Sequence, residues 1–195
     1  RWGNWGYGLM RQTGGTCVSS GRRPSMGGQA NGSVFGMGVL DIAGGTFTQT
    51  DTGTFFCLGE HGPGYLSVSG SGVFHSDIPL NFAVYESQQV EGRAVVRDGG
   101  TLEVSDAYAG AGQGSKTAYF SNGILRPCGA KPMAVDFFRG VQTSVGAGGI
   151  TVDTCGKTLS LSGPLVDAVG KLKASNLVHR WSFNGGSLAD SVGGL

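Results

Sequence analysis

GGTFTQTDTG at residues 44–53 and GGTLEVSD at residues 99–106 decide the fold, because each is a glycine step followed by a short strand-like stretch. Similar steps are GGTCVSSG at 14–21, GSGVFHSD at 70–77, NGILRPCG at 122–129 and GGITVDTCG at 148–156. The second residues of these steps recur at unequal but similar intervals: Gly15, Gly45, Ser71, Gly100, Gly123 and Gly149. A period in the twenties, built on turn glycines and strand formers, predicts a β-solenoid whose coils cover one another's apolar faces.

Strand-like segments with a period of two stand on both sides of these steps, which predicts an inward-facing set. Its members are Leu40, Ile42, Phe47, Leu66, Val68 and Val73. Two or three strands of about five residues fit one coil of about 26–30 residues. We therefore expect the six step residues to stack in one corner column, with Phe47, Val73, Leu102 and Leu125 facing the core. A β-sandwich with glycine-rich hairpins is the alternative fold.

The composition supports an all-β chain and excludes several partners. Glycine supplies 38 of 195 residues without a Gly-X-Y triplet, and only 14% of residues are charged. The formal net charge is +1 with no basic stripe, so nucleic acid is not an expected partner. No apolar run approaches the ~20 residues of a membrane helix, so no membrane insertion is expected. The chain begins RWGNWGYGLM, and both of its ends are expected to be cuts through a longer protein.

The sequence predicts no enzyme, cofactor or metal site. His61, His75 and His179 are far apart and have no ligand spacing, and no nucleophile elbow is present. A polysaccharide-cleaving solenoid needs acids that recur at one repeat position with basic partners nearby. Counted from the glycine steps, the acids occupy different positions: Asp41, Asp51, Asp98, Glu103 and Asp153. We therefore expect no catalytic residue, no cofactor and no metal.

Four cysteines allow two disulfides with three pairings: Cys17, Cys57, Cys128 and Cys155. Cys128 and Cys155 follow Gly123 and Gly149 at nearly the same distance along the chain, which places them in successive coils. Stacked strands are ~4.8 Å apart, close to the Cα separation of a disulfide, so Cys128–Cys155 is the favoured pair. Cys17 shares the position of Phe47 and Leu102, which favours a buried free thiol.

The stretch YFSNGILRPCGAKPMAVDFFRGVQTSVGAGGITVDTCGKTLSLSGPL at residues 119–165 resembles the autotransporter-associated β-strand repeats of very large bacterial surface and secreted proteins. Residues 31–110 are similar to looser repeats of the same proteins. The resemblance implies a right-handed parallel β-helix used as a passenger or stalk, without shared catalytic residues. Cys155 departs from the pattern, where Asn is usual. The matching residues are Asn122, Gly123, Leu125, Val145, Gly146, Gly148, Gly149, Asp153, Thr154, Gly156, Leu159, Leu161 and Gly163.

Residues 177–194, LVHRWSFNGGSLADSVGG, resemble the opening strand of laminin G-like (concanavalin A-like) domains. The resemblance implies a solenoid over residues 1–170, followed by a linker and the first strand of a truncated second domain over residues 171–195. No glycan site can be assigned to this piece. The matching residues are His179, Arg180, Trp181, Ser182, Phe183, Asn184, Asp190, Ser191, Gly193 and Gly194.

Two functions are compatible with these features. The first is a non-enzymatic, extracellular structural or adhesive solenoid at a bacterial cell surface, with head-to-tail or lateral self-association. Trp2, Trp5 and Tyr7 at one end and residues 178–183 at the other are the expected docking segments of a filament. The alternative is a glycan-binding or polysaccharide-cleaving β-helix, which aromatic side chains aligned on the outer surface would favour.

Overall fold

The computed structural model describes residues 2–3, 6–21, 24–28, 36–50, 53–85, 90–127, 136–156, 158–161, 165–167, 181–182 and 189–190. In these residues the chain forms β-strands and no helix, so none of the described elements is a helix able to span a membrane. Parallel strands stack as a β-solenoid of about five turns. The predicted all-β solenoid is confirmed. The β-sandwich alternative is wrong, because every pairing among the stacked strands is parallel.

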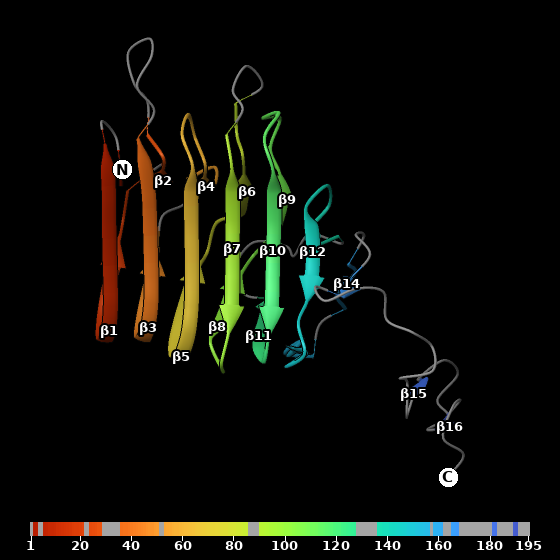
Figure 1. The fold of residues 1–195 in the computed structure, drawn as a ribbon. Coiled ribbons are helices and arrows are strands. Elements are labelled where there is room, and N and C mark those ends of the chain that lie inside the picture. Colours follow the sequence, from red (N-terminus) through yellow and green to blue (C-terminus); the bar gives the residue numbers. More distant parts are fainter. Residues whose placement is uncertain are drawn as a thin grey trace.

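The large sheet starts with three long strands, β1 (Tyr7–Ser19), β3 (Met37–Gln49) and β5 (Gly64–Ser76). In later coils the corresponding stretch divides at a corner. The strands before the corner are β7 (Gly92–Arg97), β10 (Lys116–Ser121), β12 (Gln142–Val145) and β14 (Leu165–Asp167). The strands after it are β8 (Thr101–Val104), β11 (Gly123–Pro127) and β13 (Ile150–Val152). Figure 1 shows the long strands and those before the corner in a row, in the order of the sequence.

A smaller sheet forms the other wall of the solenoid. Its strands are β2 (Ser25–Met26), β4 (Phe56–Leu58), β6 (Leu80–Phe82) and β9 (Ala107–Ala109), again parallel. Each coil therefore runs through the strand before the corner, the strand after it and a short third strand. This arrangement uses the two or three strands per coil that the repeat spacing predicts.

The strand register fixes the length of each coil. Tyr7 pairs with Met37, whereas the shorter second coil pairs Gly38 with Gly64. Towards the other end the coil is shorter still, because Thr143 pairs with Leu165. The coils are therefore similar but not identical in length, and the differences are absorbed in the connections between strands.

The predicted corner column is correct at Gly15, Gly45, Gly100 and Gly123 and wrong at the two remaining positions. Gly45 pairs with Gly72 rather than standing opposite Ser71, and Gly123 pairs with Ile150 rather than Gly149. In β5 the reason is an irregular register, where the corner holds an extra residue. The left-handed backbone that a corner needs lies at the column residue or just before it. The angle φ is +75° at Gly45, +59° at Gly70 and +72° at Gly149.

The same shift corrects the predicted core. Phe74, not Val73, faces inward beside Phe47 and Leu102. The rings of Phe47 and Phe74 stack at 5.7 Å, and Phe56 of the small sheet meets Phe74 edge-on at 5.1 Å. Aromatic rings from both sheets therefore fill the space between them. The other predicted core residues are buried as expected: Leu40, Ile42, Phe47, Leu66, Val68, Leu102 and Leu125.

The first coil has a polar residue at one inward position that later coils fill with apolar side chains. Gln12 occupies the position that Ile42, Val68 and Val96 fill in later coils. Its amide nitrogen lies 3.0 Å from the Gly15 carbonyl and 3.1 Å from the Thr46 carbonyl, to which it donates. The end of the first coil is thus held by hydrogen bonds where later coils use apolar packing.

The aromatic residues near the start of the chain differ in their surroundings. Trp2 packs against Phe47 and Phe56 and so covers one end of the core. Tyr7 is 67% exposed, so it does not share that role. Trp5 lies outside the described residues.

The cysteine predictions have mixed outcomes. Cys17 pairs with Phe47 and is a free thiol, as predicted, but it is half-buried rather than buried. Cys57 is a buried cysteine on β4, and Cys155 is an exposed free thiol. Cys128, the expected partner of Cys155, lies outside the described residues, as does the acid Asp51.

β15 (Trp181–Ser182) and β16 (Ala189–Asp190) form a separate antiparallel pair. They lie within the segment assigned to the second domain, and most of residues 171–195 lie outside the described residues. The division at residue 170 stays a prediction.

Candidate functional site

Charged side chains form a column on the outer surface of the strands after the corner. His75 of β5 pairs with Glu103 of β8, and Glu103 pairs with Arg126 of β11. Asp153, next to β13, continues the column. We call these four residues the charge ladder. Basic and acidic side chains alternate in it, so each member faces a partner of the other kind in the next coil.

The distances show that the ladder is joined from coil to coil. His75 Nδ1 lies 3.5 Å from Glu103 Oε1, and Arg126 Nη1 lies 3.8 Å from Glu103 Oε2. Arg126 Nε donates to Asp153 Oδ2 at 2.9 Å. His75 Nε2 also lies 3.2 Å from Asp77 Oδ1. The guanidinium of Arg126 therefore stands between the two ladder carboxylates.

The hydrogen bonds hold the end of the ladder in its charged form. The backbone N–H of Cys155 and, next, the Arg126 guanidinium lower the pKa of Asp153. The hydrogen bond to Asp153 raises the pKa of Arg126. Asp153 is therefore ionised at neutral pH and has no proton to give to a leaving group.

The ladder corrects the expectation that the acids occupy different positions. Glu103 and Asp153 share one position with Arg126 between them, whereas Asp41 lies before the corner and pairs with Arg11. Counting from Gly149 instead of Ile150 displaced Asp153 by one position. The recurring acid–base column therefore exists, but its basic member fills the gap between its acids.

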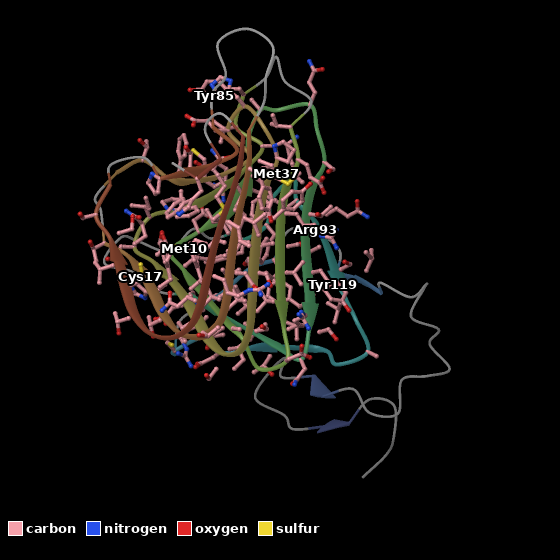
Figure 2. The ribbon with its side chains drawn as sticks, turned by 60° about the vertical axis from the view of Figure 1, so that its left-hand side comes forward. Met10, Cys17, Met37, Tyr85, Arg93 and Tyr119 are labelled. Carbon is pink, nitrogen blue, oxygen red and sulfur yellow. The ribbon has the colours of Figure 1, made fainter. Side chains whose placement is uncertain are left out.

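A groove lies on the outer surface of the strands before the corner, with a volume of about 470 Å³. Two rows of outward-facing side chains line it. Arg93, Thr117 and Gln142 form one row, and Tyr119 and Ser144 belong to the other. Figure 2 shows Arg93 and Tyr119, which both line this groove. We call this region the groove face; its residues are Glu91, Arg93, Thr117, Tyr119, Gln142, Ser144 and Val166.

Tyr65 stands next to the groove face, where it pairs with Arg93 in the sheet. Its hydroxyl donates to Glu91 Oε2 at 2.7 Å. Burial, followed by the hydrogen bond to Glu91, raises the pKa of Tyr65 to about 12. The phenol is therefore a fixed donor at neutral pH, and one oxygen of Glu91 is already occupied.

A third polar cluster joins two coils on the small sheet. Arg139 makes a two-pronged ion pair with Asp106, with Nη1–Oδ1 at 2.9 Å and Nη2–Oδ2 at 2.7 Å. Its guanidinium also lies 4.5 Å from the ring centre of Tyr108. Since Asp106 is almost buried, this cluster is structural.

In the part of the chain that the structure describes, no group of three His, Cys, Asp or Glu side chains is arranged to hold a metal ion. Sequence reasoning missed both the ladder and the groove face. The alignment of Asp153 with Glu103 could have been found by counting from Ile150, the corner residue that pairs with Gly123. The groove face has no local signal in the sequence, because most of its residues are ordinary outward positions of strands from successive coils.

Comparisons with protein-family models, with curated proteins and with solved structures found no match. The resemblances to autotransporter-associated repeats and to laminin G-like domains therefore depend on the sequence motifs alone.

Proposed function

We propose that this chain is a structural segment of an extracellular bacterial surface protein, a rigid β-solenoid stalk without catalytic activity. The observation that carries the proposal is the charge ladder, in which acidic and basic groups of successive coils bind one another. Such pairing joins the coils of β5, β8, β11 and β13 in turn and leaves the ladder carboxylates occupied. The repeat resemblance supports a right-handed helix and a location at the cell surface.

A glycosidase mechanism does not fit the ladder. Two catalytic carboxyl groups need a gap that holds the scissile bond and, in inverting enzymes, a water molecule. Arg126 fills that gap between Glu103 and Asp153. One of the acids must also keep a proton at working pH, whereas the pKa of Asp153 is lowered.

Turnover assays test this proposal. The purified chain is expected to release no reducing ends or unsaturated products from pectin, alginate or neutral polysaccharides, beside an active lyase as positive control. Cleavage that disappears in both Glu103→Gln and Asp153→Asn, with folding retained, would show that the ladder is a catalytic site and would overturn the proposal.

Self-association into filaments has one observation in its favour. β1 offers 13 residues of strand edge, and β3 is its one sheet neighbour among the described strands. Tyr7, Leu9 and Val18 on it are exposed. An open edge of this length pairs readily with another strand. Sedimentation over a wide concentration range tests this: growth of the particle with concentration supports filaments, and a constant monomer contradicts them.

A further inference from the structure

The groove face has the form of a ligand site rather than of a coil junction. Its volume of about 470 Å³ falls within the roughly 300–1,000 Å³ of typical small-ligand sites. Most of its polar side chains stand on the paired strands β7, β10 and β12, so their positions are fixed by the sheet before any ligand arrives. A pre-organised site of this kind loses little conformational entropy on binding.

Arg93 differs from the other arginines that the structure describes. Arg11, Arg97, Arg126 and Arg139 each have a carboxylate partner at 2.7–2.9 Å. Arg93 has no such ion pair within the described residues; its sheet neighbours are Tyr65 and Thr117. Its side chain is exposed at the groove, which leaves its planar set of N–H donors available to an incoming anion.

The other lining groups suit a polyhydroxylated molecule. Thr117, Gln142 and Ser144 offer hydroxyl and amide groups that both donate and accept. One carboxylate oxygen of Glu91 accepts from the Tyr65 hydroxyl, and the other oxygen can accept from a sugar hydroxyl. The half-buried ring of Tyr119 adds an apolar surface with a polar end, and Val166 adds a small apolar edge.

We propose that the groove face binds an acidic saccharide, with the carboxylate of a uronic acid on Arg93 and the sugar hydroxyls on Thr117, Gln142 and Ser144. Tyr119 supports the sugar ring. A saccharide is favoured over a simple anion. The anion would use only the Arg93 guanidinium, whereas the hydroxyls of a sugar also form hydrogen bonds with Thr117, Gln142 and Ser144. Glu91 repels a carboxylate and accepts from a hydroxyl, so the acidic group is placed on Arg93 and a sugar hydroxyl on Glu91. This site is independent of the proposed stalk role.

Titration calorimetry with two probes tests the proposal: a galacturonic acid trimer, and maltotriose as the neutral trimer. The acidic trimer is expected to bind and maltotriose to bind at least about tenfold more weakly, because charged hydrogen bonds contribute more than neutral ones. Arg93→Gln is expected to lower the affinity for the acidic trimer about tenfold or more. Arg93→Lys keeps the charge but loses the planar donors, so an intermediate affinity is expected.

Arg97→Gln is the matched control, since Arg97 ends the same strand, is exposed and pairs with Asp98 away from the groove. It is expected to leave binding unchanged. Tyr119→Ala should weaken binding of both trimers, and circular dichroism reports whether each variant is folded. Absence of binding at millimolar trimer, equal binding of the two trimers, or an Arg93→Gln variant that binds like the parent would each overturn the proposal. None of these results would touch the stalk role, which the turnover assay tests separately.

Discussion

The charge ladder and the groove face lie on the same solenoid, on strands separated by a single corner, yet they use charge in opposite ways. On the ladder, Arg126 binds the acids of the coils on both sides. On the groove face, Arg93 stands between Tyr65 and Thr117 and keeps its donors free of any described carboxylate. A repeating frame therefore offers a binding surface where the pairing between its coils stops.

The largest loss of stability is expected from a substitution at Leu102, which is fully buried in β8. Leu102→Asp removes apolar packing and places an unpaired carboxylate in the core, at a cost of about 4 kcal/mol or more. Chemical denaturation is expected to show loss of the cooperative transition or a large drop in its midpoint. Glu103→Gln, on the neighbouring outward position, is the control. A Leu102→Asp variant as stable as this control would contradict the assigned inward face.

Phenylalanines under the two faces can be compared directly. Phe74 lies beneath the ladder and packs on Phe47 and Phe56, whereas Phe120 lies beneath the groove face and packs on Phe138. Alanine at either position is expected to lower the free energy of unfolding by about 3–5 kcal/mol. Phe74→Leu serves as the conservative control. A loss below about 1 kcal/mol at one site would show that its side of the core is loosely packed.

The corner between the two faces is tested at Gly45. Its φ of +75° strains an alanine, and the added Cβ would lie 2.2 Å from the Gly15 carbonyl oxygen. Gly45→Ala is expected to lower the free energy of unfolding by about 1–3 kcal/mol. Gly14→Ala is the control, because its Cβ would meet nothing within 4 Å. Equal stability of the two variants in thermal melts would show that the corner column is misplaced.

The smallest expected effect is the pH response of the ladder. The folded protein lowers the pKa of Asp153 below 3.8, so its contribution is present above that pH and is lost as the pH falls through the lowered value. The parent chain is expected to lose slightly more stability than Asp153→Asn between about pH 4 and pH 2. Parallel acid titrations of the two chains, followed by circular dichroism, measure the difference. Identical curves would mean that the pair with Arg126 adds nothing.

Much of the fold could be predicted from the sequence because glycine steps and strand alternation recur in every coil. The register could not, because the corner of β5 contains one more residue than its neighbour in β3. Because of the extra residue, Phe74 rather than Val73 faces the core. A related miscount at Ile150 hid the alignment of Asp153 with Glu103.

The groove face was missed for a different reason. Its residues come from successive coils and are mostly ordinary outward positions of strands, so no local motif marks them. What distinguishes Arg93 is the lack of a described carboxylate partner, and that is a property of the neighbouring coils. Only the sheet register shows that Tyr65 and Thr117 are its neighbours.

Arg126 is expected to join coils, whereas Arg93, which has no described carboxylate partner, is expected to bind a ligand. Measuring both the free energy of unfolding and the affinity for the galacturonic acid trimer in Arg126→Gln and Arg93→Gln separates these two roles. Arg126→Gln is expected to lower stability by up to about 1 kcal/mol with unchanged affinity, whereas Arg93→Gln is expected to lower affinity about tenfold or more with unchanged stability. Loss of both properties in both variants, or loss of affinity in Arg126→Gln alone, would show that the two roles are not separate.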